Sequence, residues 1–205
     1  MRKTAQTQVP ILDLIAERWS PRAFLPRLVE HNHLIGLLEA ARWAASSRNL
    51  QPWNFIVATR EKPQDYTRLF ECLSENNQRW AGSAPLLIMV VATVENNGAH
   101  NRVALYDSGL AVGNLTAQAM HSGLMLRQMG GFDRDKARQL YNIPATHEPV
   151  VVLAIGYPAP VESMPEDMRT RESAPRARKP LSEFVFSGTW GQGSHVLGEP
   201  AGTAS

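Results

Sequence analysis

The order of apolar and polar positions divides the chain into alternating helical and extended segments. Leu34, Leu37, Leu38 and Ala41 repeat at the spacing of one helix face, which predicts a helix over residues 33–45. The longest helical pattern covers residues 101–123. Shorter helices are predicted over 11–18, 63–73 and 133–141.

Between these helices lie four segments with strand character. Residues 53–59 are rich in aromatic and β-branched side chains, and 124–129 predict a short strand. The run "PLLIMVVATV" (85–94) is continuously apolar, which predicts a strand buried on both faces. A further apolar strand is predicted over 148–158. The alternation indicates an α/β or α+β fold with a sheet buried between helices.

A chain of 205 residues is long enough for one well-buried core and does not require two domains. We predict a single domain over residues 1–186, in which the proline-rich, charged stretch 158–180 is a surface excursion. From 187 to 205 the composition is dominated by Gly, Ser, Thr and Ala, which predicts a loose C-terminal tail.

Charge and cysteine content narrow the possible partners and the compartment. A formal net charge of +2 gives no case for nucleic-acid binding. The single cysteine, Cys72, rules out an internal disulfide and fits a reducing compartment. The longest apolar run is about half of a bilayer span, and no apolar segment follows Arg2 and Lys3 as in a secretory signal. We therefore expect a cytoplasmic protein without nucleic-acid or membrane partners.

The usual signatures of catalysis by side chains are missing. The sequence has no G-x-S-x-G elbow, no Walker loop, no H-E-x-x-H and no cysteine pair for zinc. His31 and His33, two residues apart before a helix, are interpreted as solvated. We predict no metal site and no catalytic side chain, so that a cofactor carries any chemistry.

The segment "RWSPR" places Arg18, Ser20 and Arg22 at alternate positions after a predicted helix end. Guanidinium groups form bidentate, charge-assisted bonds with phosphate, and the hydroxyl adds a donor. A phosphate site is one interpretation of this segment. The other is a turn with two surface arginines.

Polar side chains also follow the helix at 33–45. Ser46, Ser47, Asn49 and Gln51 offer donors and acceptors that suit a ring edge with carbonyl and N–H groups. Capping of the preceding helix is the alternative.

Two further segments have two interpretations each. In "MGGF", Gly130 and Gly131 leave backbone N–H groups uncovered, which favours a flat ligand, although a tight turn needs the same residues. In "RARKPL", Arg176, Arg178 and Lys179 add to a phosphate site or solvate a loop.

Taken together and in order, the motifs resemble those of the FMN-dependent nitroreductase family. They are "RWSPR", "AASSRNLQPWNFIV", "DSGLAVGNL" (107–115), "MGGFD", "AIGYP" (154–158) and "RARKPL". The resemblance covers residues 12–186. It implies an α+β fold, with a central mixed β-sheet flanked by helices, in an intertwined homodimer with two FMN molecules at its interface. Such an interface gives a reason for the row of small residues Gly109, Gly113 and Ala117. Taken alone, that row fits tight helix packing within one chain equally well.

The resemblance also assigns cofactor-binding roles. Arg18 and Ser20 are expected on the phosphate side of FMN, and Arg22 near the pyrimidine edge of the ring. Ser46, Ser47 and Asn49 are expected from the partner chain, with Gln51 as a further contact. The remaining expected contacts are Gly130 and Gly131 near flavin N5, and Arg178 with Arg176 at the phosphate.

The implied activity is that of an FMN-dependent NAD(P)H oxidoreductase. It would reduce nitroaromatics, quinones or similar conjugated acceptors by ping-pong hydride transfer through flavin N5. The same fold also serves dehalogenases, azoline oxidases and flavin-fragmenting enzymes, and a non-enzymatic FMN-binding protein is a further alternative.

Two positions depart from the family pattern. Ala45 replaces the proline that usually precedes the serine pair. Arg127 stands where a neutral residue or histidine is expected. It would either bring positive charge to the substrate cavity and favour anionic acceptors, or be an exposed arginine on an edge strand.

Overall fold

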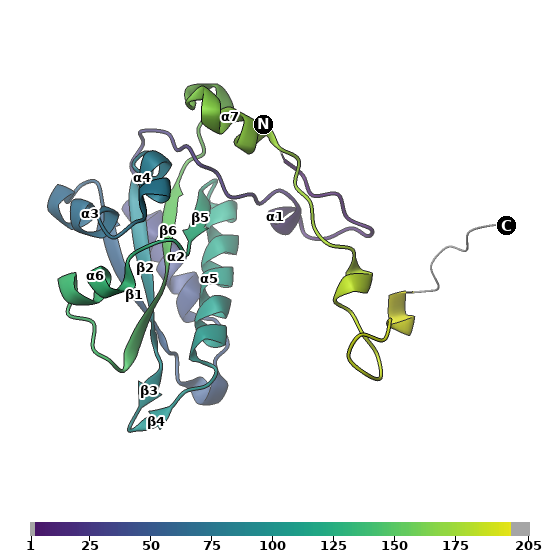
Figure 1. Ribbon diagram of the computed structural model, residues 1–205. Coiled ribbons are helices and arrows are strands. Elements are labelled where there is room, and N and C mark those ends of the chain that lie inside the picture. Colours follow the sequence, from purple (N-terminus) through teal and green to yellow (C-terminus); the bar gives the residue numbers. More distant parts are fainter. Residues whose placement is uncertain (1–2, 198–205) are drawn as a thin grey trace. The chain divides into compact units, whose positions relative to one another are not determined.

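The computed structural model describes residues 3–197 and contains a four-stranded sheet (Figure 1). The strand order is β1-β2-β6-β5, and each of the three pairs is antiparallel. The strands are β1 (Trp53–Thr59), β2 (Leu86–Thr93), β5 (Met125–Met129) and β6 (His147–Gly156). The predicted α+β class, with a central sheet flanked by helices, is confirmed. The sheet was expected to be mixed, but within residues 3–197 its strands pair only in the antiparallel direction.

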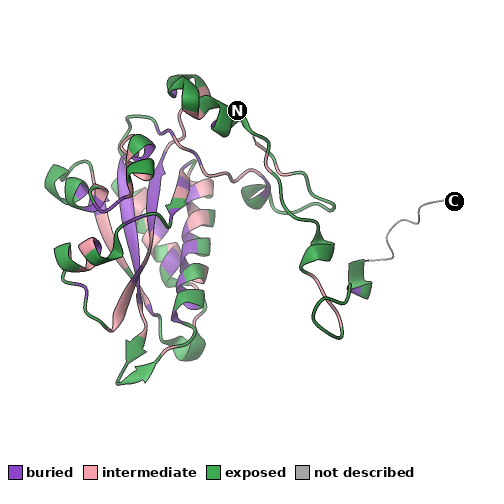
Figure 2. Cartoon of the chain, viewed as in Figure 1, coloured by how far each residue is buried: buried purple, intermediate pink, exposed green. Residues whose placement is uncertain are grey.

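The two faces of β2 enter two separate hydrophobic clusters. Leu87 and Met89 pack on the side covered by α3, α4 and α6, whereas Ile88 and Val90 pack on the side of α2 and α5. Every residue of β2 except Thr93 is buried, as the continuous apolar run predicts (Figure 2). The helices are α2 (His31–Arg42), α3 (Pro63–Phe70), α4 (Glu75–Ala81), α5 (Ala104–His121) and α6 (Arg134–Leu140).

Several helix ends agree with the sequence pattern. Pro63 begins α3, and the Asp133 carboxylate caps α6 by accepting a hydrogen bond of 2.9 Å from the backbone N–H of Lys136. The predicted helix over 11–18 is shorter: α1 covers only Asp13–Ala16. The apolar side chains of this segment, those of Ile11, Leu12, Leu14 and Ile15, are exposed in the single chain, and within α1 only Ala16 is buried.

Three elements were not expected from the pattern. They are α4, the hairpin of β3 (Glu95–Asn96) and β4 (Ala99–His100), and α7 (Glu166–Ser173), which lies inside the stretch interpreted as a surface excursion. The hairpin turns through Asn97 and Gly98, with φ of 50° and 75°. An Asn-Gly pair is the usual signal for such a turn, so this hairpin was readable from the sequence.

The chain divides into two compact units, the first ending at Ala174 and the second beginning at Pro175. In the second unit, Phe186 and Gly193 form an isolated β-bridge, and the hydroxyl oxygens of Ser187 and Ser194 lie 2.6 Å apart. The short 3-10 helices of the two units are η1 (Ser47–Asn49), η2 (Val161–Ser163), η3 (Leu181–Glu183) and η4 (His195–Leu197). The predicted domain boundary at residue 186 stays a prediction, and residues 198–205 of the predicted tail lie outside the described part.

Candidate functional site

The segment after α1 brings two of the expected phosphate-binding side chains together. Arg18 donates a hydrogen bond from Nη1 to Oγ of Ser20 at 3.2 Å, and both residues are half-buried. An isolated bridge between Phe24 and Pro158 anchors the end of this segment to the residues that follow β6. The alternation of Arg, Ser and Arg therefore produces one local group of donors.

Arg22 is held by a residue that the sequence did not indicate. Its Nη1 lies 3.3 Å from Oε2 of Glu172 on α7 and donates a hydrogen bond to it. The other carboxylate oxygen, Oε1, accepts a hydrogen bond of 3.1 Å from Nε1 of Trp19. Glu172 is only 3% exposed. Its partners Trp19 and Arg22 lie about 150 positions earlier in the chain. A contact between residues so far apart cannot be predicted from a local sequence pattern.

Arg127 approaches the same segment from the edge strand β5. Its Nη1 donates a hydrogen bond of 2.7 Å to the backbone carbonyl oxygen of Ser20, and its guanidinium carbon lies 5.4 Å from the ring centroid of Trp80. Burial lowers the pKa of Arg127, the charge of Arg22 lowers it further, and that of Glu172 opposes both. The interpretation of Arg127 as an exposed arginine is wrong, because its guanidinium is half-buried and bound to the backbone.

The polar turn between α2 and β1 is fixed by hydrogen bonds of its own and by one to α5. The backbone N–H of Ser47 donates to Oδ2 of Asp107 at 3.0 Å, and that of Gln51 donates to Oγ of Ser46 at 3.1 Å. The side chain of Gln51 donates to the carbonyl oxygen of Asn49 at 3.1 Å. Helix capping does not explain these residues, since the C-cap of α2 is Trp43.

The backbone of this turn is strained. Arg48, Asn49 and Gln51 have φ of 52°, 55° and 47°, in the left-handed region that disfavours residues with a Cβ atom. Each such residue costs on the order of 1–2 kcal/mol. The hydrogen bonds to Asp107 and Ser46 help to offset this cost. Ser47, Asn49 and Gln51 are left exposed.

The two glycines after β5 differ in their surroundings. The carbonyl oxygen of Gly131 accepts hydrogen bonds from Nδ2 of Asn77 at 2.8 Å and from the backbone N–H of Ser74 at 3.1 Å. A Cβ atom on Gly131 would lie 3.0 Å from Oγ of Ser74, whereas one on Gly130 would meet nothing within 4 Å. Gly131 is thus explained by close packing near α4, and Gly130 leaves open space above the backbone.

The two C-terminal arginines belong to the second unit. Arg178 donates a hydrogen bond of 2.8 Å from Nη1 to the carbonyl oxygen of Ala177. Burial lowers the pKa of Arg176, and the charge of Arg178 adds to this effect. Within that unit the two cations therefore act on each other.

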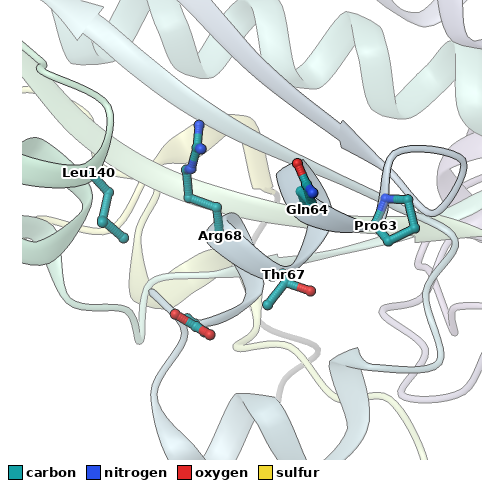
Figure 3. Close-up of a pocket in the computed structure, with 6 residues that line it drawn as sticks. Pro63, Gln64, Thr67, Arg68 and Leu140 are labelled. Carbon is teal, nitrogen blue, oxygen red and sulfur yellow. The ribbon is translucent and has the colours of Figure 1, made fainter.

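A surface hollow between α3 and α6 is separate from these residues (Figure 3). It is lined by Pro63, Gln64, Thr67, Arg68, Glu71 and Leu140. None of the predicted cofactor-binding residues contributes to it. Across residues 3–197 we find no cluster of three or more His, Cys, Asp or Glu side chains that could hold a metal ion. That range also has no helix with the length and apolar character for a membrane span.

Comparison with known sequences decides the family. The model of the nitroreductase family matches residues 15–157, well over half of the chain. The chain belongs to the nitroreductase family. Among curated relatives of this nitroreductase-family protein, a 15.4 kDa protein from the ask 5' region of Mycolicibacterium smegmatis is 31% identical over 128 residues. That match covers 62% of this chain and 86% of the relative.

A second curated relative is an NADH dehydrogenase of Thermus thermophilus, which is 26% identical over 88% of this chain and 98% of its own. Solved structures agree. An oxidoreductase containing FMN is 32% identical, with a TM-score of 0.85 over 91% of this chain and 96% of its own. A nitroreductase family protein from Clostridium difficile 630 is 25% identical, with a TM-score of 0.69 over 88% and 99% of the two chains.

Proposed function

We propose that this nitroreductase-family protein is an FMN-dependent oxidoreductase. It takes hydride from NADH or NADPH and reduces nitroaromatics, quinones or similar conjugated acceptors. The observation that carries the proposal is the group of donors at Arg18, Ser20 and Arg22, set beside the edge of the sheet. The FMN named for one similar structure and the NADH named for one relative support the choice of cofactor and electron donor.

The residues present fit FMN by their chemistry. A phosphate monoester needs cations and hydroxyl donors, and the neighbouring guanidinium of Arg18 and hydroxyl of Ser20 supply both. A flat ring needs a face without side chains, and a Cβ atom on Gly130 would stand in open space. The exposed amide and hydroxyl groups of Ser47, Asn49 and Gln51 suit a ring edge with carbonyl and N–H groups.

We further propose that the site is shared between two copies of the chain. On α5, the small residues Gly109, Gly113 and Ala117 are all exposed, and a Cβ atom on either glycine would meet nothing within 4 Å of its own chain. Leu105 and Tyr106 are exposed on the same helix. Such a surface lets a second backbone approach closely. In this arrangement Ser46, Ser47 and Asn49 reach the cofactor held by the partner.

Bound FMN supplies the redox chemistry, by accepting a hydride and returning two electrons to the acceptor. The protein's own residues bind and orient FMN and polarise its ring. Arg18 and Ser20 would hold the phosphate, and the open space at Gly130 would admit the ring. The phosphate role of Arg176 and Arg178 stays a prediction. Arg22 stabilises negative charge at the pyrimidine edge. Protonation of the product is left to water, which agrees with the missing catalytic motifs.

An absorption spectrum of the purified protein during NADPH titration tests the activity. We expect flavin absorbance that bleaches with NADPH and returns when a quinone or nitroaromatic is added. A colourless protein that cannot be reconstituted with FMN would contradict the proposal. A yellow protein that NADPH does not reduce would indicate binding without this activity.

The shared site has a test of its own. In Gly113→Glu the new side chain has room within its own chain, and glutamate favours a helix more than glycine does. The variant should therefore fold but lose the dimer and, with it, the tightly bound FMN. Sedimentation and flavin absorbance measure both. A monomeric variant that keeps FMN at wild-type affinity would contradict the shared site.

A further inference from the structure

Glu172 is a buried carboxylate whose two oxygens both bind the segment 18–22. Oε1 accepts the indole N–H of Trp19, and Oε2 pairs with Arg22. Placing a carboxylate in the interior is costly unless a cation and hydrogen bonds compensate it. The pairing therefore fixes α7 and this segment against each other.

A second cation, Arg127, interacts with the charges of Arg22 and Glu172 and is itself bonded to the backbone. Arg127 binds the carbonyl oxygen of Ser20 and stacks over Trp80. Arg22 uses Nη1 for Glu172, and its side chain is 24% exposed. A guanidinium has five N–H donors in a rigid fork. When one edge is fixed by Glu172, the direction of the remaining donors is fixed too.

We propose that Glu172 is a positioning residue for the flavin site and acts through Arg22. It holds the Arg22 guanidinium so that its free donors face the pyrimidine edge of the ring. This inference rests on the proposed function, which assigns Arg22 to that edge.

The midpoint potential of bound FMN distinguishes positioning from a simple charge effect. Reduced flavin carries negative charge near N1 and O2, and a well-placed Arg22 stabilises it. In Glu172→Gln the ion pair with Arg22 is lost, while the side chain keeps almost the same size and shape. If Glu172 positions Arg22, the potential becomes more negative and FMN binds less tightly. If Glu172 acts only as a nearby anion, its removal stabilises the reduced flavin and the potential rises.

The experiment compares the potential and the FMN dissociation constant in the full-length holoprotein and its variants. Glu166→Gln is the matched control, because it makes the same change in charge on an exposed residue of α7. It should leave both quantities at their wild-type values. In an Arg22→Gln background, adding Glu172→Gln should lower the potential no further, because the two residues act as one unit.

Trp19→Phe is a second route to the same answer. It changes no charge and removes only the N–H that fixes Oε1 of Glu172. The potential should fall here too, by less than in Glu172→Gln. If Glu172→Gln fails to fold, this variant decides by the same criterion.

A rise or no change in potential in Glu172→Gln overturns the inference, as does an equal fall with and without Arg22. In those cases wild-type protein still binds FMN, and the proposed function stands. Wild-type protein that cannot be loaded with FMN refutes the proposed function and the inference together.

Discussion

The backbone N–H of Ser47 donates a hydrogen bond of 3.0 Å to the carboxylate of Asp107 on α5. Asp107 is only 3% exposed, so this bond joins a buried acidic group to a turn at the surface. The turn contains three non-glycine residues with positive φ. A strained backbone persists only where its surroundings hold it. Asp107 therefore keeps the 46–51 turn in the shape that presents its exposed side chains.

Asp107→Ala should destabilise the protein by about 1.5–3 kcal/mol, the range for a hydrogen bond to a charged group. FMN affinity should fall as well, because the turn is no longer fixed. Urea unfolding and flavin fluorescence measure the two effects. Ser108→Ala is the control: its buried hydroxyl has no hydrogen-bond partner in the described part of the chain, so its removal should be neutral or stabilising. Equal stability of the two variants would argue against a structural role for Asp107.

Arg18→Ala should weaken FMN binding by about 1.5–3 kcal/mol, because a charge-assisted bond to the phosphate is lost. Titration of the apoprotein with FMN measures the change. The control is Arg68→Ala, which removes the same charge from the hollow beside α3 (Figure 3). It should bind FMN as the wild type does. Wild-type affinity in Arg18→Ala would remove Arg18 from the phosphate site.

The sequence was most informative where local periodicity reports burial. The apolar run of β2 and the face of α2 that includes Leu37 and Ala41 both lie in the core as predicted. The alternation of Arg18 and Ser20 also places two side chains together that form a hydrogen bond in the structure. In each case the residues that interact are close together in the sequence.

Other features of the structure could not be predicted from the sequence, for physical reasons. The segment of α7 has only one apolar residue, Met168, so no periodicity marks the helix. The partners of Glu172 are about 150 residues away. The left-handed turn at Arg48 and Asn49 contains no glycine that would signal it. The helix predicted over 11–18 covers only Asp13–Ala16, and its apolar residues Leu14 and Ile15 are exposed in the single chain.

The guanidinium of Arg127 donates a hydrogen bond to the backbone carbonyl oxygen of Ser20. This contact leads to a prediction about specificity for the electron acceptor. In Arg127→Ala, the ratio of turnover with anionic and neutral quinones should stay as in the wild type, because the charge is already engaged. FMN affinity should fall, because the 18–22 segment loosens. Arg127→Lys is the companion variant, since it keeps the charge but not the planar fork. A ratio that changes in Arg127→Ala and is preserved in Arg127→Lys would instead place the charge in the substrate cavity.

The hydrogen bond from Tyr157 to Glu30, at the start of α2, predicts a pH effect. This bond is the main cause that lowers the pKa of Glu30 to about 2 from its ordinary 4.5, with backbone hydrogen bonding and Arg27 adding to it. Because the pKa is lower in the folded state, the stabilisation is present above about pH 4.5 and is lost as the pH falls toward about 2. In Tyr157→Phe the pKa of Glu30 should rise toward 4.5, as measured by NMR titration of its carboxyl carbon.

Glu39, on the same helix, is the internal control for that titration. Its pKa is also about 2, but Arg42 and Trp43 are the cause, so Tyr157→Phe should leave it unchanged. A rise at Glu30 alone would assign the effect to the lost hydroxyl. If both carboxyl groups shift, the substitution has disturbed α2 as a whole. If Glu30 stays at about 2, then Arg27 and the helix backbone are sufficient to hold it there, and the stability between pH 4.5 and 2 does not depend on Tyr157.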